Sequence, residues 1–300
     1  MHSISNNIKN CQLSIYLIKK FAAFKNFNKG RGGTLLKVFL AYILFLAICI
    51  VGYKEMPILI KYSLLGEDSF YSGLITNLFS SAVDFLVFSF VLYFLLAKHD
   101  RTEKVRLYKD NIDDSRFLFS DEAAFRNAAN VKRLQVLGEN SLDLSKCNLK
   151  NTKIKEIKLV DSKLMGACLD DTNFEKSIFL NVNFKGASAK NALMNNIIVK
   201  KGNFKNFDFS SSQMIGAKII DTDFSKSNLG SANFKATIFL NCNFLDASMN
   251  DCNMERADLR GAINLTVNQL LQCKSIKYAY LEKNLESAMG GPVSLGRRRP

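Results

Sequence analysis

Residues 232–261 divide into six consecutive groups of five, ANFKA, TIFLN, CNFLD, ASMND, CNMER and ADLRG. The middle residue of every group is large and apolar, and the first residue is small. A strict step of five matches neither the 3.6-residue period of an α-helix nor the two-residue period of a β-strand. It is typical of a unit that turns a corner every five residues, with its large and small side chains pointing inward.

The same pattern extends over residues 141–263. Stepping by five gives twenty-four apolar centres, from Leu144 to Leu259, without an insertion. The residue two places before the centre is small in nineteen of these units, and the residue between is often Asn or Asp, which serves turns. Repeats of this kind are the signature of a solenoid, in which each unit packs on its neighbours.

Five residues are too large for the small inward position, and these are Leu142, Ile157, Val182, Ile197 and Phe207. Leu142 begins the block, so we expect it to belong to the cap of the solenoid. Phe207 lies between the two large centres Phe204 and Phe209. Three neighbouring phenylalanines crowd one interior, so Phe207 predicts a local bulge or an outward flip.

These units resemble the pentapeptide-repeat family, whose motif is A(D/N)LXX; ADLRG at 257–261 and ANFKA at 232–236 are close copies. The resemblance covers about 140–263. It implies an all-β, right-handed quadrilateral β-helix with four units per coil, and therefore about six coils. Solenoid ends expose backbone edges, so we expect short helical caps at 121–137 and, with Thr266 as N-cap, at 266–271. The C-terminal cap region is 264–288, and the Gly-rich 289–300 is expected to be disordered.

Two apolar stretches, 34–53 and 74–97, precede the repeats. Each is long enough to cross a membrane as a helix, and neither has the polar face of a helix in a soluble core. Residues 1–33 carry six basic and no acidic side chains, and more basic residues follow 97. The positive-inside rule therefore places both termini in the cytoplasm. We expect a transmembrane hairpin at 34–97, in a multi-pass protein of a bacterial inner membrane, with a juxtamembrane linker at 98–140.

Asp84 falls near the middle of the second stretch, with Asn77, Ser80 and Ser81 on the same helix face. A carboxylate at that depth is unfavourable unless it faces protein or water, or is protonated. Two interpretations stay open. Asp84 forms an oligomer contact or an ion path, or it is hydrogen-bonded within the hairpin, where Tyr42 lies at similar depth.

One face of the expected β-helix is apolar on the outside. Residues twenty apart stack when four units make a coil, and the face centred on 159, 179, 199, 219, 239 and 259 has seven outward apolar residues. They are Val160, Ile178, Leu180, Ile198, Ile220, Ile238 and Leu240. Such a strip is typical of a contact with a protein, with a second copy of the chain or with a membrane. Alternatively, residues 98–140 fold back and cover it.

Catalytic and metal-site signals are absent from the sequence. The two histidines, His2 and His99, lie outside the repeats, so we expect no catalytic residue, no metal and no cofactor. The seven cysteines show no CxxC pair, and those at the small repeat position are interpreted as small apolar residues in a reducing compartment. The net charge of +14 comes mostly from outside the repeats.

A membrane-anchored scaffold with a cytoplasmic rod that binds proteins is the favoured function. The alternatives are a membrane regulator or small oligomeric channel that uses Asp84, and a secreted effector that inserts into a host membrane. The resemblance also raises protection of gyrase by imitation of DNA. That mechanism requires a strongly acidic rod, whereas 141–265 holds 17 basic and 13 acidic residues. No nucleic-acid partner is expected.

Overall fold

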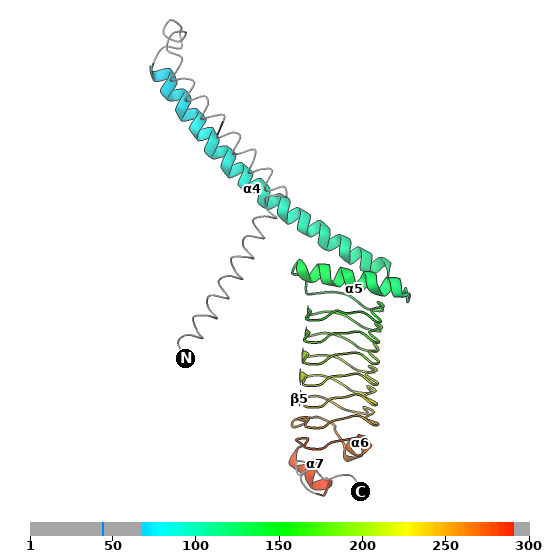
Figure 1. Ribbon diagram of the computed structural model, residues 1–300. Helices are drawn as coiled ribbons and strands as arrows, with labels where there is room; N and C mark the ends of the chain where they lie inside the picture. The colour runs from blue at the N-terminus through cyan, green and yellow to red at the C-terminus, as the bar shows by residue number, and fades with distance from the viewer. Residues whose placement is uncertain (1–43, 45–67, 291–300) are drawn as a thin grey trace, which may run out of the picture. The chain divides into compact units, whose positions relative to one another are not determined.

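The computed structural model describes residue 44 and residues 68–290 (Figure 1). The chain divides into two compact units, Met1–Thr102 and Glu103–Pro300. The predicted segments 1–33 and 34–53, apart from Leu44, lie outside the described residues, as does 291–300 of the predicted tail. Each unit is therefore described by itself.

A single long helix, α4 (Asp68–Asp114), contains the second predicted span, 74–97. Among the described residues it is the one helix long and apolar enough to cross a membrane. Its large apolar side chains are exposed rather than packed, with Phe79 at 71% and Phe88 at 64%. Its length and composition are those of a helix that could cross a membrane. The predicted hairpin of two spans is not tested by the described residues.

The second unit contains a parallel β-solenoid. Its strands are β1 (Lys158–Val160), β2 (Ile178–Leu180), β3 (Ile198–Lys200), β4 (Lys218–Ile220) and β5 (Ile238–Leu240). They form one five-stranded sheet in sequence order, along the side labelled β5 in Figure 1. Every pair is parallel and in register at a spacing of twenty residues, as in Leu159 opposite Phe179. This spacing confirms the prediction of four five-residue units per turn.

The backbone turns a corner at a fixed place in every unit. The residue two places after each centre has a positive φ, for example 54° at Asn151 and 49° at Asp161. L-residues enter this left-handed region at some energetic cost, which Asn, Asp and Gly tolerate best. Hydrogen bonds to the next turn stabilise the corners. For example, the backbone N–H of the corner residue Asn151 donates to Asp170 O at 2.9 Å.

The three other sides of the solenoid pair through isolated bridges rather than strands. There, Asn or Asp side chains accept a hydrogen bond from the backbone two residues on, as Asn173 does from Glu175 N at 3.0 Å. Such Asx turns bend the chain away from an extended path. The turns recur at stacked positions of one side, for example at Asn183, Asn203 and Asp223.

The regular sheet is shorter than the predicted β-helix of about six coils. From β1 to β5 the register steps from 158 through 178, 198 and 218 to 238, which is four turns. The next position on that side is Asp258, whose side chain accepts a hydrogen bond from Arg260 N at 3.2 Å. Asp258 pairs with Ile238 as an isolated bridge, so the five-stranded sheet ends at β5 while the register of twenty residues continues.

The interior is a continuous apolar column, as the step of five predicts. Phe184, Phe204, Phe224 and Phe244 stack in sequence, with centroids 4.7, 5.2 and 5.4 Å apart. All four rings are buried. The oversized residues Leu142, Ile157, Val182 and Ile197 also point inward and are buried.

The predicted bulge or outward flip at Phe207 is wrong. Phe207 is 1% exposed, and its neighbours keep the regular pairing, with Asp208 bridged to Asn228. Space for the ring comes from the adjacent turns, where Ala187 and Ser227 occupy the same register position. Ala189, a small residue at a centre position, leaves further room beside it.

Helices close both ends of the solenoid, as predicted. Helix α5 (Asp121–Val136) begins at the N-cap Ser120, whose side chain accepts from Ala123 N. At the other end, α6 (Val267–Gln272) has Thr266 as its N-cap in a capping box with Gln269. The chain then forms α7 (Lys283–Ala288).

Candidate interaction surface

The five-stranded sheet brings all seven residues of the predicted apolar strip together. They occupy two columns that flank the buried centres. Ile178, Ile198 and Ile238 stand in one column, and Val160, Leu180, Ile220 and Leu240 stand in the other. Ile198, Ile238 and Leu240 are 41%, 43% and 44% exposed, and the other four are half-buried. We call this surface the apolar strip.

Three lysines interrupt the apolar strip. Lys158 and Lys218 stand in the first column, and Lys200 stands in the second. All three are exposed, and within the described part of the chain none forms a salt bridge. The strip therefore combines apolar side chains with exposed positive charge.

Residues 103–140, which belong to the same unit as the solenoid, do not cover the apolar strip. Helix α5 lies across the N-terminal end of the solenoid, where Asn127 donates to Asn148 O at 3.1 Å (Figure 1). Helix α5 reaches the sheet at the first strand, where Gln135 Oε1 accepts from Lys158 N at 2.9 Å. For residues 103–140, the alternative in which 98–140 folds back over the strip is thus not observed.

Asp84, the predicted intramembrane polar residue, lies on α4 and is exposed. Asn77, Ser80 and Ser81 precede it by seven, four and three residues, so they lie on the same side of the helix. All three are also exposed. Tyr42, the predicted partner of Asp84, lies outside the described residues.

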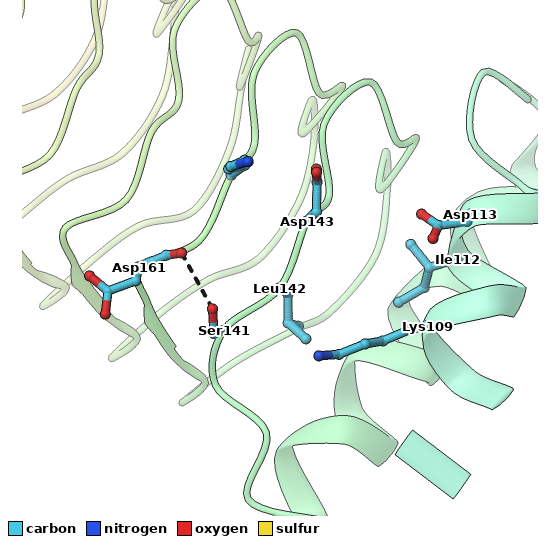
Figure 2. Close-up of a pocket in the computed structure, with 8 residues that line it drawn as sticks. Lys109, Ile112, Asp113, Ser141, Leu142, Asp143 and Asp161 are labelled. Carbon is cyan, nitrogen blue, oxygen red and sulfur yellow. Dashed lines mark hydrogen bonds between the residues drawn. The ribbon is translucent and has the colours of Figure 1, made fainter. Parts of the chain in front are cut away.

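A pocket that the sequence did not predict lies between the end of α4 and the first turns of the solenoid (Figure 2). It has a volume of about 280 Å³, and Lys109, Asp113, Asp143, Asp161 and Lys163 line it with Ile112, Ser141 and Leu142. Arg116 pairs with both Asp113 and Asp143. Burial opposes ionisation of Asp143, but hydrogen bonds from Ser145 and Arg116 hold its pKa below the ordinary 3.8. Opposite charges therefore neutralise one another here, and this pocket supplies no chemistry that we assign.

A second unpredicted feature is the apolar turn 117–119 between α4 and α5. Phe117, Leu118 and Phe119 are each more than half exposed, and Lys146 Nζ lies 5.3 Å from the ring of Phe117. Three consecutive apolar residues outside any repeat were the available sequence signal. Among the described residues, no group of three or more His, Cys, Asp or Glu side chains could hold a metal ion.

Comparison with known proteins identifies the solenoid. The family model described as pentapeptide repeats matches residues 143–179, 158–196 and 227–263, with eight copies. The matched parts of the solenoid, residues 143–196 and 227–263, consist of pentapeptide repeats. No curated protein sequence matches it.

Several solved structures are similar to this chain, with low sequence identities and low TM-scores. A trypsin-treated form of QnrB1, a plasmid-mediated fluoroquinolone resistance protein, is 12% identical over 50% of this chain and 83% of its own, with a TM-score of 0.28. HetL from the cyanobacterium Nostoc, a pentapeptide repeat protein involved in heterocyst differentiation regulation, is 15% identical. The match covers 50% of this chain and 82% of HetL, with a TM-score of 0.22. Rfr23, a pentapeptide repeat protein from the cyanobacterium Cyanothece, is 14% identical. The match covers 51% of this chain and 98% of Rfr23, with a TM-score of 0.23. These likenesses carry no conclusion about function.

Proposed function

We propose that this chain is a membrane-anchored scaffold whose apolar strip binds another protein. The observation that carries the proposal is the gathering of seven apolar side chains on the one side of the solenoid that forms strands. A rigid sheet presents these side chains at fixed positions, so little conformational entropy is lost on binding. Exposed apolar residues that are contiguous on a surface mark interaction sites.

The chemistry of the strip favours a folded protein with an apolar patch and acidic residues around it. Ile238 and Leu240 stand at one end of the strip and Ile178 and Leu180 toward the other, with the exposed Lys200 and Lys218 between them. An apolar patch on the partner would cover the isoleucines and leucines, and its carboxylates would meet the lysines. A second copy of the chain is the alternative partner for the strip, and the crosslinking experiment below distinguishes it from another protein.

The proposed location is a bacterial inner membrane, with two spans and both termini in the cytoplasm. Helix α4 supports one span by its length and composition. The basic residues before 34 and after 97 support the orientation. No catalytic step is part of the proposed function. A reporter fused to the N-terminus and another to the C-terminus would test the topology, and both should report from the cytoplasm.

The docking proposal is tested by adding two charges to the strip. Ile178→Lys with Leu240→Lys should abolish crosslinks to the partner in intact membranes, because a buried unpaired charge opposes binding. Leu193→Lys with Leu245→Lys is the matched control, since it adds the same charges at exposed leucines on other sides. Equal crosslinking by both variants would overturn the proposal. Loss of a crosslink between copies of the chain would identify self-association instead.

A second candidate function rests on Asp84. Its carboxylate is exposed on a helix whose other exposed side chains there include Val83, Leu86 and Val87. In a bilayer this group should face protein or water, so we propose that α4 associates with other helices or lines an ion path at this position. Asp84→Asn in reconstituted vesicles should change the ion flux or the oligomeric state, and no change in either would reject this candidate.

A further inference from the structure

Two cysteines meet where the solenoid joins its C-terminal cap. Cys252 occupies the small inward position of its unit, directly after Ala232 in the same stacked column. Cys273 is the residue at the C-terminal end of α6. Their Sγ atoms lie 3.2 Å apart, and both side chains are fully buried. This separation exceeds the S–S bond length of about 2.05 Å by only about 1 Å.

The backbone fixes the two cysteines on both sides of the contact. Lys274 N donates to Cys252 O at 2.8 Å, and Asp251 N donates to Gln272 O at 2.9 Å. Asn253 then bridges Ser275, so the cap continues the pairing of the solenoid. Cys273 thereby follows Ala232 and Cys252 as the next residue in the stacked column of small inward positions. The proximity follows from the ladder of hydrogen bonds and not from a chance position of a loose segment.

We propose that Cys252 and Cys273 form a dithiol–disulfide site that locks the cap onto the last turn, with a small-molecule disulfide such as oxidised glutathione as the oxidant. One cysteine, as thiolate, attacks the glutathione disulfide, which breaks and releases one reduced glutathione. The second cysteine attacks the mixed disulfide, forms the Cys252–Cys273 bond and releases the other glutathione. The two cysteine protons pass to solvent and the released thiolates.

The Cys252–Cys273 disulfide would hold the C-terminal cap over the last turn of the solenoid, where the backbone hydrogen-bonding edge would otherwise be open. The cap supplies carbonyl acceptors for the last turn, since Met254 N donates to Ser275 O at 2.7 Å and Leu259 N donates to Tyr280 O at 2.8 Å. When the cap opens, these N–H groups lose their partners, and an open edge can pair with another chain. A disulfide across the junction therefore keeps the end of the solenoid closed under oxidising conditions.

Access to the thiols requires the cap to move, because neither sulfur is exposed in the closed state. The stability of α6 should therefore set the rate of oxidation. Thr266 caps α6, and Gln269 Nε2 donates to Phe244 O and Ala247 O at 2.8 and 2.9 Å. Thr266→Ala should raise the oxidation rate, whereas two inert cysteines in contact would not react in either protein.

The test uses the full chain in detergent, treated with oxidised glutathione and mapped by peptide mass spectrometry without reduction. We expect a peptide pair joined at Cys252 and Cys273, lighter by two hydrogen atoms and separated by a reductant. Cys273→Ser and Cys252→Ala should abolish it. Cys242→Ala is the matched control, because Cys242 occupies the same kind of buried position, where burial raises the pKa of its thiol to about 12. It should leave the linked peptide unchanged.

Hydrogen exchange supplies the second readout. Oxidation should slow exchange at the amides of Lys274 and Tyr280 at least about tenfold, because the closed loop restricts opening of the cap. Absence of the linked peptide, even in Thr266→Ala, would overturn the proposed site. A linked peptide with unchanged exchange would overturn the lock. Modification of the half-buried Cys168 alone would likewise reject the pair.

Discussion

The rings of Phe207 and Phe209 lie with their centroids 4.1 Å apart inside the solenoid. Both residues belong to one turn, and the residues at the same register positions one turn earlier are Ala187 and Ala189. The two large rings thus fill the space that two small residues leave. This exchange of volume between turns explains how an oversized residue fits without a bulge.

Phe207→Ala should open a cavity in this cluster. We expect the free energy of unfolding to fall by about 3–5 kcal/mol, the range for truncation of a buried aromatic residue. Thermal unfolding of the full chain in detergent, followed by the β-sheet circular dichroism signal, would measure the loss. Leu245→Ala, at a 45% exposed position, is the control and should change the midpoint little. Equal midpoints for both variants would mean that Phe207 is not packed in the interior.

Gly202→Ala should destabilise the protein, although alanine occupies the same position in other units. A Cβ at Gly202 would lie 2.7 Å from Val199 Cγ1 and 3.2 Å from Phe204 Cε2. Overpacking of this kind typically costs about 1–3 kcal/mol. Val199→Ala removes the closest atom, so the double variant should be less unstable than the sum of the two single variants. Additive losses would contradict the contact.

Acid should weaken the solenoid through carboxylates that are hydrogen-bonded in the fold. Hydrogen bonds from Arg260 lower the pKa of Asp258 below 3.8. Burial works against ionisation of Asp208, but Ser210 and Lys190 outweigh it, so its pKa is also lowered. A lowered pKa in the folded state stabilises the fold above the unfolded pKa, and the stabilisation is lost as the pH falls through the folded pKa.

We therefore expect the unfolding midpoint to be nearly constant above about pH 5 and to fall below about pH 4. Asp208→Asn should reduce that fall while keeping the Asx turn, because an amide oxygen still accepts from Ser210 N. Unfolding curves across this range would measure the effect. Asp246→Asn, at an exposed corner residue, provides the comparison. A fall of the same size in Asp208→Asn as in the unaltered protein would contradict the assignment.

Thr266→Ala should destabilise α6 by about 0.5–2 kcal/mol, since the helix loses its N-cap hydrogen bond and its capping box. The loss should appear as faster hydrogen exchange over 267–272, with little change at the centre of the solenoid. Thr266→Ser keeps the hydroxyl and should retain most of the protection. Faster exchange throughout the solenoid would show that the cap does not open separately.

The step of five predicted a repeated unit that turns a corner with its large and small residues inward, and the resemblance to the pentapeptide-repeat family implied the solenoid with four units per turn. The apolar strip could also be placed, since a register of twenty residues follows from four units per turn. The five strands and the end of the sheet at β5 were not predicted, because the register of twenty residues continues beyond β5. The inward position of Phe207 depends on the small residues in the adjacent turns, and the sequence of a single unit does not show them.

Features outside the repeat were the least predictable. The pocket beside Asp113 and Asp143 depends on how the end of α4 packs on the first turn, which no local pattern encodes. Cys252 and Cys273 are 21 residues apart, and α6 lies between them. Their contact follows from the path of the cap, so their spacing in the sequence does not indicate a pair.

The most direct measurement of the central claim is site-specific photo-crosslinking in intact membranes. A photoreactive residue at position 240 would lie on the apolar strip, and one at 245 would lie on another side with nearly equal exposure, 44% against 45%. We predict that 240 forms a crosslink to one defined protein, that Ile178→Lys abolishes this crosslink, and that 245 does not form it. Identical crosslinking from 240 and 245 would contradict docking on the strip.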